Sequence, residues 1–285
     1  MPDRSGSDPA LPPRAVRRAL APLLVDPAAT AVLSDFDGTL SPIVDDPDDA
    51  RPLPGAALLL ARLADRFGTV AVVSGRPVSF LLDHLSSTEG AAGTGHRTGG
   101  GAVPHFVGLY GLEHSTPDGR VVPDPVAAEW RPVVDATVAR LRAAAPEGAF
   151  VEPKGLAVTV HWRTVPGAAW ASGAVRDEEE RTGLQVHPGR RNLELRPPSA
   201  IDKGSVVARL LEGRRAACYF GDDLGDLPAF AALAHAARRG MATVAVAVAD
   251  EESPAEVLEA ADLIVQGPDE AFAALYWLAE SPPVG

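Results

Sequence analysis

Two groups of acidic residues follow apolar runs directly, and their types suit phosphoryl-transfer chemistry. Asp35 and Asp37 lie in the sequence Asp-Phe-Asp-Gly-Thr, immediately after the apolar run 31–34. A carboxylate can attack phosphorus to give an aspartyl-phosphate, and a neighbouring acid can carry the proton that this reaction must move. The same residues are also typical of an Asp-Gly turn, which needs no chemistry at all.

The second acidic group is the sequence Gly-Asp-Asp-Leu-Gly-Asp at residues 221–226. Asp222, Asp223 and Asp226 repel one another unless a cation lies among them, and hard carboxylate oxygens are the ligands that Mg²⁺ prefers. The alternative is helix capping, for which one acid would be enough. Three acids within five residues therefore favour a Mg²⁺ site.

A hydroxyl and a lysine complete a candidate site for an anion. Ser74, Gly75 and Arg76 lie between an apolar run and an expected helix, where a hydroxyl and backbone N–H groups can bind phosphate; Ser74 could equally cap that helix. Lys203 opens another expected helix, at the end where the macrodipole disfavours a cation. Lys154 and Lys203 are the two lysines among 26 basic residues, so both are candidates for positions that need a compact ammonium group.

The elements expected around these residues alternate between apolar strands and helices. This alternation is typical of a parallel α/β sheet, and such sheets bind ligands at the carboxyl ends of their strands. The expected strands are 31–35, 69–74, 106–110, 217–220, 243–248 and 263–265, and the expected helices are 14–24, one from Pro54 to Phe67, one from Pro77, one from Lys203, 227–237, 255–261 and 270–279.

The segment 112–196 has a different pattern, with short extended pieces around two helices. Strands are expected at 150–151, 157–162, 184–186 and 192–196, and helices at 126–144 and 168–181. We therefore predict a doubly wound (Rossmann-like) parallel-sheet α/β core over 14–111 and 197–285, interrupted by a smaller inserted α+β cap domain at 112–196. The ends of this scheme are a flexible tail over 1–13 and a Gly-rich surface insertion over 88–104.

The composition excludes several other classes of protein. The 285 residues hold 38 acidic and 26 basic residues, a net charge of −12 without any basic cluster, which argues against nucleic acid or a membrane surface as a partner. The single cysteine, Cys218, excludes an internal disulfide. Residues 1–30 do not resemble a signal peptide, and no apolar run reaches the roughly 18 residues of a membrane span. We expect a cytoplasmic protein that acts on a small molecule, as a monomer, although the oligomeric state stays open.

Taken in order, four of these segments resemble the motifs of the haloacid-dehalogenase-like phosphatase superfamily. They are DFDGT, Ser74, Lys203 and GDDLGD. Haloacid dehalogenases themselves lack the second acid of the first motif, so Asp37 indicates a phosphatase or phosphotransferase. The roles expected are Asp35 as nucleophile, Asp37 as general acid and base, Ser74 and Lys203 as ligands of the phosphoryl oxygens, and Asp35, Asp222 and the backbone carbonyl of Asp37 as Mg²⁺ ligands, with Asp223 and Asp226 as nearby acids.

The segments of the expected cap are similar to those of trehalose-6-phosphate phosphatases. The similarity runs through DFDGTLSPI, SGR, GLYGLE, Glu-x-Lys at 152–154, His-x-Arg at 161–163, LELRP and DKG. It implies that Glu152, Lys154 and Glu194 contact the sugar. Cross-strand ion pairs on a solvated sheet are the alternative interpretation of the cap residues. The other residues that we expect to line the substrate site are Gly75, Arg76, His161, Arg163 and Arg196.

Two positions depart from the family pattern GDDxTDE, because Gly225 stands in place of the Thr and Leu227 in place of the Glu. These differences bear on substrate choice. Phosphatases of sucrose 6-phosphate or of glucosyl- or mannosyl-glycerate phosphates would use the same core. A phospho-accepting regulatory domain also places acids, a lysine and a hydroxyl at strand ends, but it has no cap. The resemblance implies Mg²⁺-dependent hydrolysis of trehalose 6-phosphate to trehalose and phosphate.

Overall fold

The structure is a computed structural model that describes residues 10–44, 49–86, 103–162, 165–189 and 191–284. Most of the expected tail and of the Gly-rich segment lies outside these ranges, and so does Arg163. Among the described residues, no helix combines the length and the apolar character that a membrane crossing requires.

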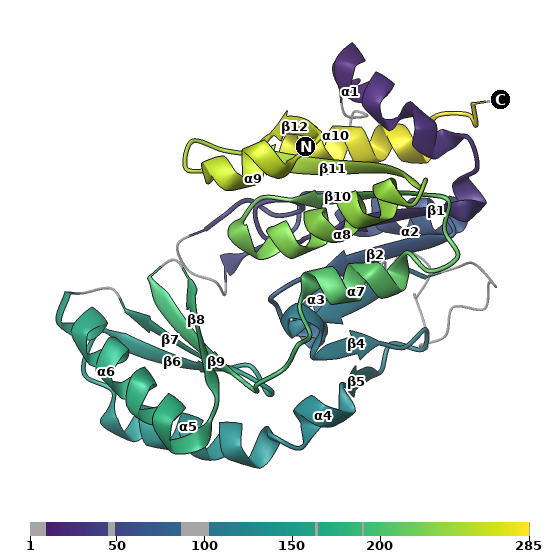
Figure 1. Ribbon diagram of the computed structural model, residues 1–285. Coiled ribbons are helices and arrows are strands. Elements are labelled where there is room, and N and C mark those ends of the chain that lie inside the picture. Colours follow the sequence, from purple (N-terminus) through teal and green to yellow (C-terminus); the bar gives the residue numbers. More distant parts are fainter. Residues whose placement is uncertain (1–9, 45–48, 87–102, 163–164, 190, 285) are drawn as a thin grey trace, which may run out of the picture.

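The larger sheet contains eight strands (Figure 1). In chain order they are β1 (Thr30–Ser34), β2 (Thr69–Val73), β3 (His105–Gly108), β4 (Glu113–Ser115), β5 (Val121–Pro123), β10 (Ala216–Gly221), β11 (Ala242–Ala249) and β12 (Leu263–Gln266). Their order across the sheet is β12-β11-β10-β1-β2-β3-β4-β5. The strands from β12 to β3 run parallel, whereas β4 and β5 add an antiparallel edge.

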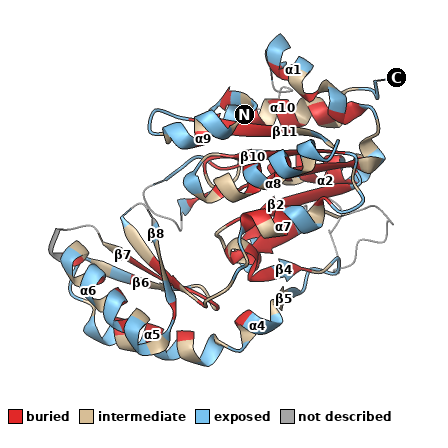
Figure 2. Ribbon diagram, in the orientation of Figure 1, coloured by how far each residue is buried: buried red, intermediate tan, exposed pale blue. Residues whose placement is uncertain are grey.

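Helices cover both faces of this sheet, as the doubly wound prediction requires. One face carries α1 (Arg14–Leu20), α2 (Ala56–Arg66), α3 (Val78–Leu85) and α10 (Gly267–Glu280), and the other carries α7 (Lys203–Leu210), α8 (Leu227–Arg238) and α9 (Ala255–Ala260). Side chains of a strand alternate between the two faces, so Val32 packs in the first core and Leu33 in the second. Both faces are buried, which explains the continuous apolar strands (Figure 2).

A second, antiparallel sheet forms the smaller module, which we call the cap. Its strands are β6 (Ala149–Pro153), β7 (Val158–Trp162), β8 (Gln185–Gly189) and β9 (Asn192–Arg196), in the order β6-β7-β9-β8. The helices of this part are α4 (Pro125–Ala128), α5 (Arg131–Ala144) and α6 (Val165–Thr182). Apolar residues of α5, α6 and the sheet, such as Leu141, Val175 and Val160, form a core separate from those of the large sheet. An α/β core with a smaller antiparallel module is thus confirmed.

Three local features differ from the sequence predictions. The strands β4 and β5 hydrogen-bond to the large sheet, although the division at residue 112 assigns them to the inserted domain. The expected helix 126–144 is two helices, α4 and α5, with Pro132 in the first turn of the second, where its missing N–H is tolerated. The expected strand 106–110 ends at Gly108, because Leu109 and Tyr110 adopt left-handed backbone angles, with φ of 50° and 60°.

Candidate active site

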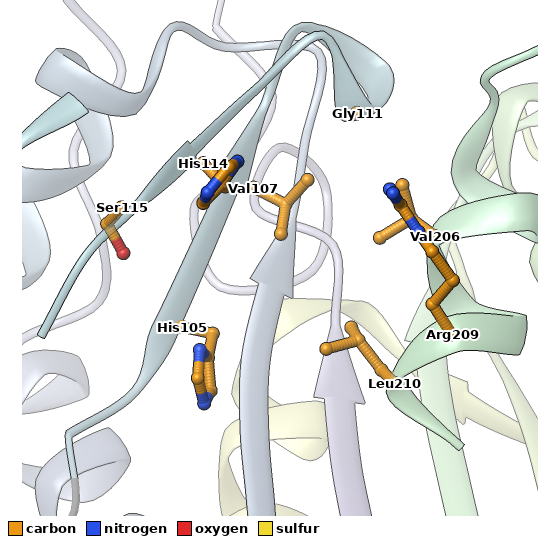
Figure 3. Close-up of a pocket in the computed structure, with 8 residues that line it drawn as sticks. All are labelled: His105, Val107, Gly111, His114, Ser115, Val206, Arg209 and Leu210. Carbon is orange, nitrogen blue, oxygen red and sulfur yellow. The ribbon is translucent and has the colours of Figure 1, made fainter. Parts of the chain in front are cut away.

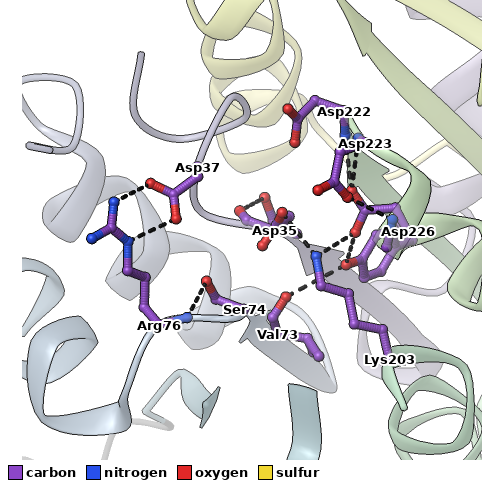
Figure 4. A network of polar contacts seen from close by, with 12 residues as sticks. Asp35, Asp37, Val73, Ser74, Arg76, Lys203, Asp222, Asp223 and Asp226 are labelled. Atoms are coloured by element: carbon purple, nitrogen blue, oxygen red, sulfur yellow. Dashed lines mark hydrogen bonds and ion pairs between the residues drawn. The ribbon is translucent and has the colours of Figure 1, made fainter. Parts of the chain in front are cut away.

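The central strands of the large sheet bring the predicted polar residues together. β1 pairs with both β10 and β2, so Asp35, Ser74 and Asp222 follow three adjacent strands at the same edge of the sheet. The backbone N–H of Asp35 donates to the carbonyl oxygen of Phe220 at 2.8 Å, which extends the ladder to the first site residue. Figure 4 shows the resulting group of side chains.

Lys203 lies at the centre of the group and is 2% exposed. Its Nζ is 2.8 Å from Oδ2 of Asp35 and 2.7 Å from Oδ1 of Asp226. Burial would lower the pKa of this lysine, but the charges of Asp226 and Asp35 outweigh burial and raise it well above its usual value. Asp202 caps α7 through a capping box with Ser205, which anchors the helix that starts at Lys203. Lys203 is therefore a buried, protonated cation.

Asp226 is fully occupied by hydrogen bonds from the protein. Its Oδ1 accepts from Lys203 and from the hydroxyl of Tyr219 at 2.7 Å. Its Oδ2 accepts from the backbone N–H groups of Asp222 and Asp223, at 2.9 and 3.2 Å. This side chain shapes the loop that carries the other two acids.

The capping alternative holds in part for Asp223. Its Oδ1 accepts from the N–H of Gly225 at 2.8 Å, so it caps the short 3₁₀ turn η5 (Leu224–Asp226). A capping contact uses one carboxylate oxygen, and a carboxylate has further acceptor sites. Capping and metal binding are compatible for this exposed residue.

Oxygens suited to a cation remain in the cluster. One carboxylate oxygen from each of Asp35, Asp222, Asp223 and Asp226 lies within 4.8 Å of the others. Because donors of the protein already occupy both oxygens of Asp226, the other three acids have acceptor sites left for a cation. The Oδ1 atom of Asp35 is buried and has no hydrogen-bond partner among the residues that the structure describes. Burial, followed by the charges of the other three acids, raises the pKa of Asp222 to about 10. A divalent cation would relieve this repulsion, so the donor set fits Mg²⁺.

The backbone at Gly38 makes room for this cluster. Its φ is +69°, and a Cβ built there would lie 2.1 Å from Oδ2 of Asp222. Only glycine permits both the left-handed turn and the close approach of the Asp222 carboxylate. The Gly of the first acidic motif is therefore explained by the packing of two motifs against each other.

Asp37 points away from the lysine and pairs with Arg76 (Figure 4). The Arg76 guanidinium donates from Nε to Oδ2 at 2.8 Å and from Nη2 to Oδ1 at 2.7 Å. The guanidinium also stacks on Phe80, 4.7 Å from the ring centroid. Ser74 is buried, and its Oγ accepts a hydrogen bond from the N–H of Arg76 at 3.1 Å. Helix α3 begins at Val78 with Pro77 as its N-cap, so Ser74 is not the N-cap residue of this helix.

Two ionic groups lie on the cap strands. Oε2 of Glu152 is 2.8 Å from Nε2 of His161 and 3.8 Å from Nζ of Lys154. Burial raises the pKa of Glu152, but His161 and the charges of Lys154 and Arg76 outweigh burial and leave the pKa lowered. The register of β6, β7 and β9 aligns Glu152 with Thr159 and Thr159 with Glu194.

Glu194 and Arg196 form the second group of the cap. Nη2 of Arg196 donates to Oε2 of Glu194 at 2.9 Å. Oε1 of Glu194 and Nε of Arg196 are buried, and within the described part of the chain neither has a hydrogen-bond partner. The hydroxyl of Thr159, which is paired with Glu194 across the strands, is a third such atom, so the described part of the cap holds three polar atoms that a ligand can satisfy.

The sequence was compared with models of known protein families. A family model described as trehalose-phosphatase matches residues 33–95 and 106–261, which includes the four motifs and the cap. The chain belongs to the trehalose-phosphatase family.

Named members of the trehalose-phosphatase family resemble the chain over most of its length. The trehalose-phosphate phosphatase of Mycolicibacterium paratuberculosis is 37% identical over 214 residues, which are 71% of this chain and 51% of the relative. The chain therefore spans about half the length of the curated relatives it matches.

Solved structures show the same fold at lower identity. The C-terminal domain of the C. albicans trehalose-6-phosphate phosphatase has a TM-score of 0.69 at 21% identity, covering 96% of this chain and 99% of that one. A trehalose-6-phosphate phosphatase related protein has a TM-score of 0.70 at 22% identity, covering 87% and 96%. The trehalose-phosphatase fold thus extends over the core and the cap.

Most predicted site residues of this chain gather in two places. The core group holds Asp35, Ser74, Lys203, Asp222, Asp223 and Asp226, with Asp37, Gly75 and Arg76 beside it, and the cap group holds Glu152, Lys154, His161, Glu194 and Arg196. Arg163 lies outside the described residues. Assignment of individual roles to these residues stays a prediction.

Three residues were missed by the sequence predictions. Tyr219 donates to Asp226 from an apolar strand, where its hydroxyl gave no signal. Glu113 accepts from the N–H of Val78 at 2.6 Å and so satisfies the start of α3. Tyr110 contacts both the core and the cap. Tyr110 and Glu113 both belong to the segment GLYGLE, which could have drawn attention to them.

A hollow of a different character lies beside α7. The cavity of about 230 Å³ opens between β3, β4 and α7 (Figure 3). His105, His114 and Arg209 are among its lining residues, and none of the lining residues is acidic. Burial, followed by the charges of His114 and Arg214, lowers the pKa of His105. This cavity is distinct in composition from the acidic cluster.

Proposed function

We propose that the chain hydrolyses trehalose 6-phosphate to trehalose and inorganic phosphate. The observation that carries the proposal is the state of Asp35, a buried carboxylate with one oxygen held by Lys203 and the other unpartnered. A nucleophile needs such orientation together with a free oxygen. The family match and the polar pairs of the cap support trehalose 6-phosphate as the substrate.

In the first half of the reaction, the Asp35 carboxylate attacks phosphorus. A bond forms between an Asp35 oxygen and phosphorus, and the bond from phosphorus to the sugar oxygen breaks. Asp37 donates a proton to the departing sugar oxygen, so that trehalose leaves as the neutral alcohol. Lys203 and Ser74 stabilise the charge on the phosphoryl oxygens.

In the second half, water hydrolyses the aspartyl-phosphate. Asp37, now ionised, accepts a proton from the water as its oxygen attacks phosphorus. The bond between Asp35 and phosphorus breaks, phosphate leaves, and the carboxylate of Asp35 is restored. One residue thus serves as acid and then as base, which explains why the first motif needs two acids.

The proposed metal ion is Mg²⁺. Asp35, Asp222 and the backbone carbonyl of Asp37 would hold it, with Asp223 and Asp226 close by. When bound, Mg²⁺ supplies positive charge against the phosphoryl oxygens and offsets the repulsion among the acids. In this proposal the cap recognises the sugar. The residues that would contact it are Glu152, Lys154, His161, Glu194 and Arg196.

The test is release of inorganic phosphate from trehalose 6-phosphate, sucrose 6-phosphate and glucose 6-phosphate, each with and without a chelator. We expect trehalose 6-phosphate to be hydrolysed fastest, and only when Mg²⁺ is present. The matched control is Asp35→Asn, which keeps the size of the side chain and removes the nucleophile. This variant should release no phosphate while keeping the circular dichroism spectrum of the wild type.

Each part of the proposal has its own contradicting result. Equal rates on the three sugar phosphates would reject trehalose 6-phosphate as the preferred substrate. Activity that survives complete chelation would reject the metal. Turnover by Asp35→Asn would reject the aspartyl-phosphate.

A further inference from the structure

Tyr110 occupies a position where the core and the cap meet. It lies in the 3₁₀ turn η4 (Leu109–Gly111) that follows β3, and its backbone N–H donates to the carbonyl oxygen of Ser74 at 3.0 Å. Tyr110 has a φ of 60° and a ψ of 19°, a left-handed conformation that is uncommon for a bulky residue. Non-glycine residues in this region persist where the surrounding structure fixes them, and they cluster at functional sites.

The ring of Tyr110 contacts several motifs of the core. A Cβ built at Gly75 would lie 2.6 Å from the Tyr110 hydroxyl oxygen and 2.7 Å from Cζ, so the ring packs directly against the Gly75 backbone. Nζ of Lys203 is 5.8 Å from the ring centroid. A Cβ at Gly225 would lie 3.7 Å from Cε1 of the ring. The ring thus touches the surroundings of the second, third and fourth motifs.

The same ring supports the cap residue Arg196. Cζ of Arg196 lies 3.4 Å from the ring centroid, the distance of direct stacking of a guanidinium on an aromatic face. Arg196 in turn donates to Oε2 of Glu194. Tyr110 therefore fixes a chain of contacts from the core, through Arg196, to Glu194.

The free atoms at the end of this chain match a sugar hydroxyl. Oε1 of Glu194 is an acceptor and Nε–H of Arg196 is a donor, and both are buried without a partner among the described residues. A sugar hydroxyl donates one hydrogen bond and accepts others, so sugar hydroxyls can donate to Oε1 of Glu194 and accept from Nε of Arg196. Leaving buried polar atoms unpaired costs free energy, so a polyhydroxyl ligand that hydrogen-bonds to them would bind favourably.

We infer that Tyr110 is a positioning residue for sugar recognition, which holds the Arg196–Glu194 pair against the hydroxyls of the sugar phosphate. This inference rests on the proposed function, because it assigns the pair to the sugar part of that substrate. The role belongs to the ring and not to acid–base chemistry. Burial and the charge of Glu194 raise the pKa of the Tyr110 hydroxyl well above its usual value, so the hydroxyl stays neutral.

Two variants separate the ring from the hydroxyl. Tyr110→Phe keeps the ring, and Tyr110→Asn removes it while introducing a residue that tolerates the left-handed conformation. Steady-state kinetics are measured on trehalose 6-phosphate and on para-nitrophenyl phosphate, which has the phosphoryl group but no sugar. Trehalose binding is measured by calorimetry, and thermal unfolding of each variant reports on the fold.

For Tyr110→Asn we expect KM for trehalose 6-phosphate to rise about tenfold and trehalose binding to weaken by a similar factor, as loss of a desolvated guanidinium–ring contact implies. Its kcat/KM on para-nitrophenyl phosphate should fall by a clearly smaller factor than that on trehalose 6-phosphate, because para-nitrophenyl phosphate has no sugar for the Arg196–Glu194 pair to bind. Tyr110→Phe should behave as the wild type on both substrates. With Arg196→Ala already present, Tyr110→Asn should cause little further loss, because the two residues act through one contact.

Several outcomes would overturn the inference. Equal losses on both substrates would show that Tyr110 serves the phosphoryl site or the fold. An unchanged KM for trehalose 6-phosphate would show that the ring does not position the pair, and additive losses in the double variant would show that Tyr110 does not act through Arg196. If the wild-type protein hydrolyses para-nitrophenyl phosphate but no trehalose 6-phosphate, the proposed function fails instead, and the two failures are thereby distinguished.

Discussion

Arg76 donates a hydrogen bond to each carboxylate oxygen of Asp37, from Nε to Oδ2 at 2.8 Å and from Nη2 to Oδ1 at 2.7 Å. This two-point contact fixes the plane of the carboxylate as well as its position. Arg76 is itself held by stacking on Phe80. The residue proposed to move the proton is thus oriented by a guanidinium fork, which binds it as the carboxylate, the form that accepts a proton in the second half of the proposed reaction.

Replacing the fork by a point charge tests this orientation. For Arg76→Lys we expect kcat on trehalose 6-phosphate to fall about tenfold or more, because an ammonium group cannot hold both oxygens in one plane. Steady-state kinetics provide the measurement. Arg66→Lys, on the far end of α2, is the matched control and should be unchanged. A kcat for Arg76→Lys equal to that of the wild type would exclude the orienting role.

The opposite replacement applies to Lys203. Lys203 is 2% exposed, and its ammonium group lies between the carboxylates of Asp35 and Asp226. A planar guanidinium group cannot make the same contacts in that position. We expect Lys203→Arg to lose at least about a hundredfold in kcat although the charge is kept. Arg209→Lys, on an exposed position of the same helix, serves as control. Activity of Lys203→Arg within a few-fold of the wild type would refute the point-charge requirement.

Asp226 and Asp222 should respond differently to the change from acid to amide. All four contacts of Asp226 come from donors, so the amide group of Asp226→Asn must face a donor in either orientation. We expect a loss of about 3 kcal/mol in the free energy of unfolding, measured in urea. Asp222→Asn should instead keep its stability and require more Mg²⁺ for activity. The same loss of stability in both variants would contradict this division.

Stability of the cap should depend on Glu178, which links α6 to α5. The carboxylate accepts from Arg140 at 2.8 and 2.6 Å, and this hydrogen bonding lowers its pKa from the ordinary 4.5. A lowered folded-state pKa stabilises the fold above pH 4.5, and the contribution disappears as pH falls through the lowered value.

The variant Glu178→Gln should therefore be less stable than the wild type at pH 7, by about 2 kcal/mol. At an acidic pH below the lowered pKa of Glu178, the two proteins should unfold at similar urea concentrations. Glu180→Gln, on the same helix, is the control. A difference between Glu178→Gln and the wild type that is the same at both pH values would show that the charge of Glu178 is not involved.

The large sheet could be predicted from the sequence because its strands are buried on both faces. Residues 31–34 and 69–73 are continuous apolar runs, and each is followed by the polar residue that the strand end presents. The acids could be found because they follow such runs, and Lys203 because it opens an expected helix and is one of two lysines in the sequence. By contrast, β4 and β5 have three residues each, too few for a periodic pattern.

Contacts between distant residues could not be predicted. Arg76 and Asp37 are 39 residues apart, and the sequence around either residue gives no signal that the two form a contact. The occupation of Asp226 by Tyr219 depends on an aromatic residue that the apolar strand pattern hides. The left-handed turn at Tyr110 shows that tertiary packing, here of the ring against Gly75 and Arg196, overrides the extended preference of the segment.

Because the sequence has two lysines and both lie at the proposed site, a reagent that reacts with amines can report on this site. Lys154 lies partly buried beside Glu152, and Lys203 is enclosed by two carboxylates; they are the two side-chain amines of the sequence. Acylating reagents therefore label, apart from the α-amino group, only these two positions. A bound sugar should slow the labelling of Lys154, and Lys203 should react only as the core opens. The mass of the intact protein then reports ligand binding and core opening without any introduced probe.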